Sequence, residues 1–308
     1  MSRRAPGVPV LRIGTRGSML ALTQARLIGA RLAAQRRAVP EEVIIASDGD
    51  RDTDTPLQAL ANPGVFTSAL ERGLLDGTID VAVHSLKDLP VEPTPGLALA
   101  AVGFREDPRD ALLSESRHSI ASLPPGARVG SCSVRRTAQL LALRPDLRML
   151  PLRGNIDTRI GQLLAGRFDA IVLAMAGLAR LGLGAGLVHP LPLAQLLPAP
   201  GQGALAIQCR LDDSATRAAV EPLDNCECRA ATIAERAFLE GLGGGCLAPV
   251  AASATVTGGE LMLLGAVFST DGQQAVRVRE LGSVRQARDI GLHAAHGALA
   301  RGAVGGLG

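Results

Sequence analysis

The sequence contains no tryptophan and no tyrosine, and five phenylalanines are the only aromatic residues among its 308. Proteins that bind single-stranded nucleic acid without sequence preference stack bases on aromatic side chains, so this composition argues against that function. The same scarcity argues against a scaffold with a large aromatic-anchored protein interface. A net charge of +3 gives no strong overall attraction to nucleic acid. We therefore expect no nucleic acid among the partners of this protein.

A long apolar helix and an oxidised cysteine framework are also missing. The longest run without Asp, Glu, Lys or Arg, residues 181–209, contains four prolines, which excludes a membrane-spanning helix. No apolar run follows the arginines near the N-terminus, so no secretory signal is predicted. Five cysteines are an odd number in a chain too long to need disulfides. We expect a reducing, cytoplasmic location and no contact with a membrane.

Lysine is the scarcest charged residue: Lys87 is the only lysine beside 31 arginines. A bias of the genome toward arginine codons would explain the scarcity. Alternatively, Lys87 remains where arginine cannot replace it, because the two side chains differ in shape and in pKa behaviour. The residues around Lys87 favour the second interpretation, as argued below.

Apolar runs alternate with helical patterns along the first two thirds of the chain, which predicts a parallel α/β architecture. The expected strands are residues 10–13, 43–46, 79–84, 97–102, 128–130, 148–152, 169–173 and 204–209. The expected helices are residues 19–37, 66–76, 134–143 and 156–164. From residue 228 the pattern becomes a helix, three β-like runs and a final helix, which indicates a small α+β domain.

An internal repeat links the two α/β blocks. Residues 74–80 and 163–169 each read as a helix end, a glycine and the start of an apolar strand. Any two α/β units share some of this pattern, but two similar domains that face each other would form a cleft, a usual place for a ligand. The domains are expected to comprise residues 1–104 with 200–222, residues 105–199, and residues 223–308, with residues 105–110 as a crossover.

Arginine is concentrated at the expected turns between strands and helices. Residues 128–180 hold nine arginines and three acids. Arg135 and Arg136 fall in the first turn of a helix, where the positive end of the helix dipole disfavours them, so a bound anion is expected. The other members of this set are Arg16, Ser18, Ser131, Ser133, Arg153 and Arg159. A solvated charged surface is the alternative, but the common position at turns favours recognition of carboxylates or phosphates.

Two further motifs carry reactive side chains. In residues 84–90 a buried strand delivers Ser85, Lys87 and Asp88 to the same edge, where a carboxylate can stabilise a developing cation or move a proton. A plain ion pair between Lys87 and Asp88 is the alternative, and His84 is interpreted as structural.

Three glycines precede Cys246, which predicts a deformable loop and makes a modified or nucleophilic thiol plausible. Cys226 and Cys228 are too few ligands for zinc, so no metal is expected.

These motifs, taken in order, resemble the porphobilinogen deaminase (hydroxymethylbilane synthase) family. The resemblance is carried by residues 15–18, 84–90, 105–110, 130–136, 152–155 with 158–159, 201–203, and 244–246 with 249. It implies a cytoplasmic, monomeric transferase of tetrapyrrole (porphyrin and haem) biosynthesis. Such an enzyme joins four porphobilinogen molecules head to tail, releases ammonia at each step and frees hydroxymethylbilane by hydrolysis. The implied fold has two α/β domains like the lobes of periplasmic binding proteins, with a cleft between them, and a small α+β C-terminal domain.

The resemblance also implies roles for individual residues. A dipyrromethane cofactor would be attached to Cys246 through a thioether, and Asp88 would be the catalytic carboxylate that stabilises the cation formed on deamination. The implied cofactor-binding residues are Lys87, Ser85, Ser131, Ser133, Arg135 and Arg136. The implied substrate-binding residues are Arg16, Ser18, Arg153, Arg159, Arg180 and Gln202. Each porphobilinogen unit brings an acetate and a propionate, so a growing chain demands a cleft rich in cations.

Three positions depart from the family pattern. Ala59 and Pro63 stand where the family commonly has lysines in a loop, and Ala231 stands where it has an arginine. These changes keep one alternative open, a non-catalytic or impaired two-lobed protein that binds polycarboxylates.

Overall fold

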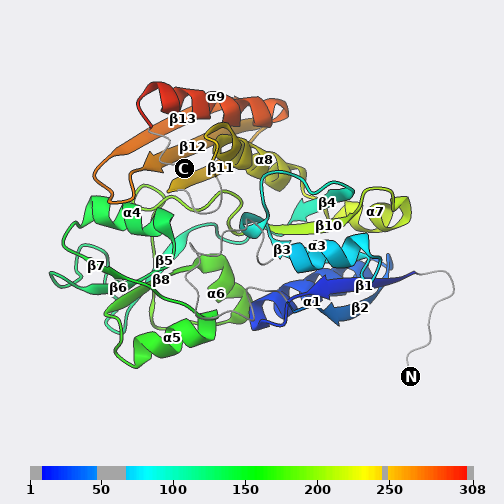
Figure 1. The fold of residues 1–308 in the computed structure, drawn as a ribbon, viewed down its shortest axis with the longest axis horizontal. Coiled ribbons are helices and arrows are strands. Elements are labelled where there is room, and N and C mark those ends of the chain that lie inside the picture. The colour runs from blue at the N-terminus through cyan, green and yellow to red at the C-terminus, as the bar shows by residue number, and fades with distance from the viewer. Residues whose placement is uncertain (1–8, 47–66, 245–248, 304–308) are drawn as a thin grey trace.

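The computed structural model describes residues 9–46, 67–244 and 249–303, which form three sheets flanked by helices (Figure 1). The first two sheets have five strands each and the third has three. The first sheet with its helices is called the first lobe below, and the second sheet with its helices the second lobe. The domain division expected from the sequence stays a proposal.

The first sheet has the order β2-β1-β3-β10-β4. Its strands are β1 (Val10–Thr15), β2 (Val39–Ile44), β3 (Val81–Ser85), β4 (Leu97–Gly103) and β10 (Leu205–Arg210). The helical segments of this lobe are α1 (Met19–Ala34), α3 (Ser68–Leu75), η1 (Leu86–Asp88), α7 (Ser214–Val220) and η2 (Glu221–Leu223). Strands β2, β1 and β3 are parallel, whereas β10 runs antiparallel to both of its neighbours.

The second sheet repeats this plan in the order β7-β6-β8-β5-β9. Its strands are β5 (Asp110–Leu113), β6 (Arg128–Gly130), β7 (Arg148–Leu150), β8 (Ala170–Ala174) and β9 (Val188–Pro190). Its helices are α4 (Val134–Leu143), α5 (Ile156–Leu164) and α6 (Met175–Leu181). Again three strands are parallel and the fourth in order, β5, is antiparallel to its neighbours.

The predicted parallel α/β architecture thus holds for most strands, and one antiparallel strand is inserted in each lobe. Strand β5 is the first strand after the chain leaves the first lobe, and β10 is the first strand after it returns. The connecting segments are called the first crossover (residues 104–109) and the second crossover (residues 199–204). Each lobe thus contains one strand that directly follows a crossover, and this ties the two lobes together.

The predicted internal repeat extends to side-chain contacts. In the first lobe Arg12 donates to Asp80 at 2.7 Å, and the backbone N–H of Arg12 also donates to that carboxylate. In the second lobe Arg128 donates to Asp169 at 2.8 Å, and its backbone N–H does the same. Each pair joins two adjacent parallel strands at their start. The shared architecture predicted from the sequence is confirmed by the matching strand orders and by these matching pairs.

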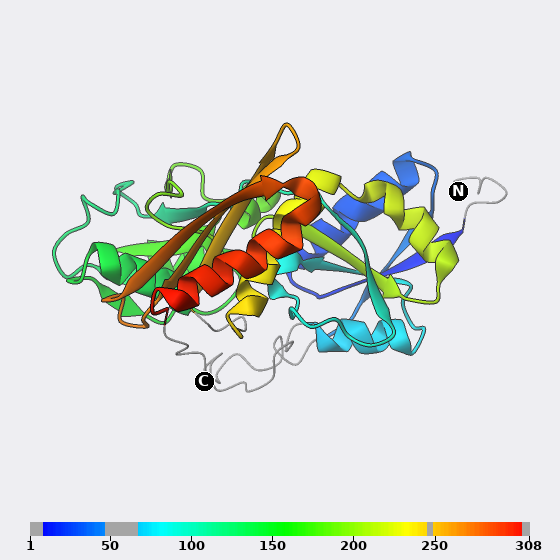
Figure 2. The ribbon, with the colours of Figure 1, turned by 90° about the horizontal axis from the view of Figure 1, so that it is seen from above.

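The third sheet lies beside the two lobes and belongs to the C-terminal part of the chain. It consists of β11 (Val250–Thr257), β12 (Glu260–Phe268) and β13 (Ala275–Ser283), all antiparallel. The helical segments here are α8 (Cys226–Gly241), η3 (Val284–Gln286) and α9 (Ala287–Ala300). Helices α8 and α9 pack together, and α9 runs along the sheet (Figure 2).

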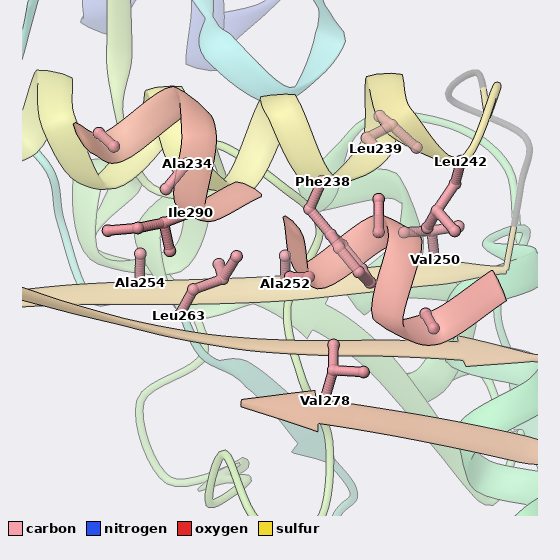
Figure 3. Packing of buried hydrophobic residues seen from close by; sticks show 14 of the residues in the cluster. Ala234, Phe238, Leu239, Leu242, Val250, Ala252, Ala254, Leu263, Val278 and Ile290 are labelled. Atoms are coloured by element: carbon pink, nitrogen blue, oxygen red, sulfur yellow. The ribbon is translucent and has the colours of Figure 1, made fainter. Parts of the chain in front are cut away.

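The core of this domain is built from small aliphatic residues around one ring. Phe238 of α8 is fully buried and points toward the sheet (Figure 3). A Cβ at Gly265 would lie 2.7 Å from that ring, so only glycine fits there. The opposite face of the sheet packs Ala251 and Phe268 in one cluster with Ala138 of α4. The C-terminal domain is therefore docked on the second lobe as well as on its own helices.

Some predicted elements differ from the observed ones. Strand β2 covers residues 39–44 rather than 43–46, because it is an exposed edge strand whose polar residues hide the strand pattern. Strand β5 begins at Asp110, inside the motif that was read as a crossover. Helices α6 and α7 and strand β9 were not predicted.

Candidate active site

The ends of β1 and β3 lie side by side and begin the site in the first lobe. Ser18 is the N-cap of α1, and its Oγ accepts a hydrogen bond from the backbone N–H of Ala21 at 3.3 Å. Ser85 ends β3 and its Oγ accepts from Nε2 of Gln24 at 2.9 Å. Arg16 directly follows the end of β1, at the same edge. The two serines therefore have structural partners within this lobe.

His84 is buried, and its Nε2 forms a hydrogen bond of 3.1 Å with Oε1 of Gln208. Burial lowers the pKa of His84 to about 4, so the ring is neutral at physiological pH. This environment agrees with the structural interpretation of His84.

Lys87 and Asp88 form the short helical turn η1 that follows β3. Asp88 is exposed, whereas Lys87 is only partly exposed and its Nζ donates to Oε1 of Gln202 at 3.2 Å. Burial lowers the pKa of Lys87 to about 8; the charge of Asp88 raises it, and that of Arg136 lowers it further. An amine so placed changes its charge more readily than an ordinary lysine.

In the second lobe, the turn after β6 presents the predicted serines and arginines. Ser133 is the N-cap of α4 and accepts from the backbone N–H of Arg136 at 3.4 Å, and Ser131 accepts from the backbone N–H of Ser133 at 3.1 Å. Arg135 and Arg136 are buried, with 4% and 7% of their surface exposed. Both lie in the first turn of the helix, as the sequence predicted.

The anion that the structure places beside these arginines is Asp110 of β5, which sequence reasoning missed. Its fully buried carboxylate accepts from Arg135 at 2.8 Å, from Arg136 at 2.7 Å and from Gln202 at 2.9 Å. Burial alone would raise the pKa of Asp110, but the charges of the two arginines hold it well below its usual range. The only signal in the sequence was an aspartate directly before an apolar run. A cofactor role for Arg135 and Arg136 stays a prediction.

Arg159 connects the second lobe to Asp88 electrostatically. Its Nε donates to the backbone oxygen of Gly154 at 2.7 Å. Burial lowers the pKa of Arg159, and so do the charges of Arg136 and Arg153, while that of Asp88 raises it. Residues from both lobes are thus within electrostatic reach of one another. This neighbourhood comprises Lys87, Asp88, Asp110, Arg135, Arg136, Arg153 and Arg159.

Arg180 and Gln202, two predicted substrate-binding residues, contact the crossovers. The Nη2 of Arg180 donates to the backbone oxygens of Phe104 at 3.0 Å and of Gly203 at 2.6 Å. Gln202 is buried and donates to the backbone oxygen of Pro108 at 2.7 Å as well as to Asp110. In the structure both side chains hold the two crossovers together, and their binding role stays a prediction.

Helix α8 contributes two further residues that the sequence reasoning did not single out. Glu235 is fully buried and accepts from Arg105 at 2.8 Å and from the backbone N–H groups of Gly201 and Ala254, each at 2.7 Å. It therefore joins both crossovers to the C-terminal sheet.

The next residue, Arg236, reaches the segment that follows Asp88. Its guanidinium donates to the backbone oxygens of Leu89 at 3.0 Å and Pro90 at 2.5 Å. The sequence offered one signal for Glu235 and Arg236: two adjacent charged residues that stand between Ala234 and Ala237.

Cys246, the predicted attachment point, lies outside the described residues, as do Ala59 and Pro63. The third departure, Ala231, is buried on α8.

The donors present suit a ligand that carries several carboxylates. Five of the seven charged side chains in the neighbourhood defined above are cations and two are anions. The buried Nε of Arg180 has no hydrogen-bond partner among the described residues. A buried donor without a partner costs about 1–3 kcal/mol, which a carboxylate oxygen would offset. A dipyrromethane bearing acetate and propionate groups fits this donor set.

Comparison with known proteins decides the family. The model "Porphobilinogen deaminase, dipyromethane cofactor binding domain" matches residues 11–218, and "Porphobilinogen deaminase, C-terminal domain" matches residues 230–300. The chain belongs to the porphobilinogen deaminase family. Porphobilinogen deaminase of Syntrophus aciditrophicus is 45% identical over 91% of this chain and 92% of its own. That of Thermobifida fusca is 46% identical over 95% of this chain and 94% of its own.

Membership of the porphobilinogen deaminase family confirms the predicted enzyme class, a transferase, and the predicted dipyrromethane cofactor. Among solved structures, a periplasmic arginine-binding protein of Salmonella typhimurium is similar with a TM-score of 0.39 and 12% identity. That match covers 70% of this chain and 92% of the other, and it is too shallow to support an inference. None of the helices that the structure describes is long and apolar enough to cross a membrane.

Proposed function

We propose that this chain is a hydroxymethylbilane synthase that condenses four porphobilinogen molecules at the cationic site between the two lobes. The observation that supports this most directly is the neighbourhood of Asp88 with Lys87, Arg136 and Arg159, within a chain of the porphobilinogen deaminase family. We further propose a cytoplasmic monomer, with the domain boundaries given by the sequence.

The cations would bind and orient the carboxylates of the substrate and of the growing chain. Guanidinium groups bind carboxylates through two parallel hydrogen bonds, which fixes direction as well as position. We assign this role toward substrate to Arg16, Ser18, Arg153, Arg159, Arg180 and Gln202. Toward the cofactor we assign it to Ser85, Lys87, Ser131, Ser133, Arg135 and Arg136. Cys246 would hold the dipyrromethane, which when bound supplies the pyrrole ring that the first substrate unit joins.

Asp88 would act on the reacting atoms. When porphobilinogen loses ammonia, the C–N bond breaks with its electron pair on nitrogen and leaves a cationic pyrrole. A fixed carboxylate next to that cation lowers the barrier to its formation. The new C–C bond then releases a proton from the ring carbon, and the same carboxylate can accept it. Asp88 is exposed, so it is accessible to a ligand.

Arg236 would fix the position of Asp88 through the segment that follows it. It donates to the backbone oxygens of Leu89 and Pro90, the first two residues after Asp88. Arg236 and Cys246 lie ten positions apart, at and just beyond the C-terminal part of α8. Helix α8, which precedes the cofactor cysteine in the sequence, would therefore also fix the segment that directly follows the catalytic carboxylate.

The mass of the purified protein tests the proposal. After expression in a host that makes porphobilinogen, the intact protein should carry an adduct of two pyrrole units, and Cys246→Ser should remove it. Cys226→Ser, which changes an exposed thiol at the start of α8, should keep it. An unmodified wild-type chain from such a host would refute the assignment of Cys246.

Ammonia release separates an enzyme from a protein that only binds polycarboxylates. Wild-type protein with porphobilinogen should release one ammonia for each unit condensed, whereas Asp88→Ala should nearly abolish release and keep the fold. Wild-type protein that binds porphobilinogen without releasing ammonia would support the non-catalytic alternative instead.

A further inference from the structure

A cavity of about 600 Å³, open to solvent, lies between the first lobe and the C-terminal domain and shares no lining residue with the neighbourhood of Asp88. Its walls come from the end of α1, the first crossover, η2, the start of α8 and strand β11. The lining residues used below are Arg31, Phe104, Arg105, Asp224, Glu227 and Ala231. This volume lies within the range of cavities that bind small molecules. None of the lining residues belongs to the predicted cofactor or substrate set.

Two of the four charged side chains in the lining are already neutralised. Arg105 donates to Glu235 at 2.8 Å, and Asp224 accepts from Arg229 at 2.8 Å. The remaining pair is Arg31, in the last turn of α1, and Glu227, in the first turn of α8. Within the part of the chain that the structure describes, neither side chain has an ion pair or a hydrogen bond. One cation and one anion therefore remain available in the same cavity.

Arg31 is held in place by an aromatic ring. Its guanidinium carbon lies 3.8 Å from the centre of the Phe104 ring, which is a cation–π distance. Stacking on one face leaves the N–H edges of the guanidinium open to a carboxylate. Phe104 itself has a φ of +52°, a conformation that costs a bulky residue energy and that is concentrated at functional sites.

The cavity also has apolar lining. Ala231 of α8 and Ala254 and Val256 of β11 face the cavity. The small side chain of Ala231 keeps this wall open, because an alanine extends no further than its Cβ. A ligand with charged ends and an apolar body would match a lining that holds both the two charges and these three residues.

We propose that this cavity is a binding site for a small zwitterion with a planar apolar body, whose carboxylate binds Arg31 and whose ammonium group binds Glu227. The site is distinct in charge from the neighbourhood of Asp88, where the sequence predicts the cleft, because the residues there are mostly cationic and favour anions. It adjoins the first crossover, since the backbone oxygen of Phe104 is one of the two that Arg180 holds.

Isothermal titration calorimetry of the full-length protein with three probes tests this site. The zwitterion 4-(aminomethyl)benzoate is compared with benzoate, which lacks the ammonium group, and with benzylamine, which lacks the carboxylate. The zwitterion should bind at least about tenfold more tightly than benzylamine, a difference of ~1.4 kcal/mol. Benzoate can also bind the cationic cleft, so the variants below separate the two sites. Equal affinity for all three probes would overturn the proposal.

Three substitutions should each remove the preference for the zwitterion: Arg31→Ala, Glu227→Gln and Ala231→Arg, the last of which fills the cavity. Two matched controls change the same charge outside the lining: Arg37→Ala near the end of α1, and Glu221→Gln in η2. The controls should bind like the wild type. Zwitterion binding that survives all three cavity substitutions would place it in the cleft and refute the site. Because binding is measured without turnover, failure here leaves the proposed enzymatic function untouched.

Discussion

The carboxylate of Asp110 and the guanidinium of Arg136 form an ion pair of 2.7 Å in which both side chains are almost completely buried. Arg135, from the same helix turn, forms a second ion pair of 2.8 Å with the other carboxylate oxygen of Asp110. Asp110 is the first residue of β5, directly after the first crossover. The pair therefore fixes the helix turn that carries the predicted cofactor-binding arginines to the strand that ties the lobes together.

Replacing Asp110 with alanine should strongly destabilise the protein. The substitution leaves two guanidinium groups buried without their counter-ion, and breaking a buried pair from one side costs about 3–5 kcal/mol. We expect a loss of this size in the free energy of unfolding measured by urea denaturation. The folded fraction that remains should also bind porphobilinogen weakly, because Arg135 and Arg136 lose their fixed positions.

Asp107→Ala is the matched control, three residues earlier. Asp107 pairs with Arg109 at 2.6 Å, but the two side chains are 32% and 40% exposed. Exposed pairs contribute about 0–1 kcal/mol, so this variant should unfold nearly like the wild type. Equal losses for Asp107→Ala and Asp110→Ala would contradict the central role of the buried pair.

The sequence predicted the alternation of strands and helices, because buried parallel strands and amphipathic helices leave clear periodic patterns. It also placed Ser133, Arg135 and Arg136 at a helix start, where capping chemistry is local. What it could not predict was Asp110 as the anion beside them. That contact joins residues 25 and 26 positions apart, and its direction depends on the antiparallel insertion of β5.

The same reasoning explains why α8 was missed as part of the site. Glu235 and Arg236 looked like ordinary helix charges, since their partners lie on other elements, 19 to 147 positions away along the chain. Only the fold shows that one side chain holds both crossovers and the other holds the segment after Asp88.

The repeated pairs of the two lobes should differ in strength although their geometry matches. Asp80 is 14% exposed and accepts from both Arg12 and Arg210, whereas Asp169 is 38% exposed and pairs with Arg128. Because solvent screens the more exposed pair, we expect Asp80→Ala to lower the free energy of unfolding more than Asp169→Ala, which should cost no more than about 1 kcal/mol. Urea denaturation of the two variants measures the difference, and a larger loss for Asp169→Ala would contradict it.

Lys87 should give the enzyme a pH dependence that arginine cannot reproduce. Its pKa is lowered from 10.5 to about 8, primarily by burial. The ammonium is therefore lost as pH rises through about 8, and with it the attraction to carboxylates. We expect kcat/KM, which reports ionisation of the free enzyme, to fall above pH 8. The charged groups that face Lys87 electrostatically are Asp88, Asp110, Arg135 and Arg136.

The ratio of Lys87→Arg to wild type isolates this effect, because ionisation of the substrate affects both proteins equally. The variant should be slower at pH 7, where the larger guanidinium disturbs Gln202, and the ratio should rise between pH 8 and 10. A constant ratio would show that Lys87 is not the titrating group. For stability the sign is opposite: the unfolded chain binds the proton up to pH 10.5, so this group makes the folded state relatively more stable as pH rises from 8 to 10.5.

Arg236 should affect the rate of the reaction more than the binding of substrate. Lysine in its place keeps the charge but cannot span two backbone oxygens with a planar fork, so the segment after Asp88 is held less firmly. Loss of one charge-assisted hydrogen bond costs about 1.5–3 kcal/mol, and even the lower value, expressed in the transition state, lowers kcat by about tenfold. We therefore expect Arg236→Lys to reduce kcat by roughly that factor with KM changed less than about twofold.

Arg288→Lys is the control, because Arg288 makes an exposed pair with Glu240 elsewhere on the same domain. It should retain wild-type kcat, and an equal change of kcat and KM in Arg236→Lys would show that Arg236 contributes to binding rather than to the position of Asp88.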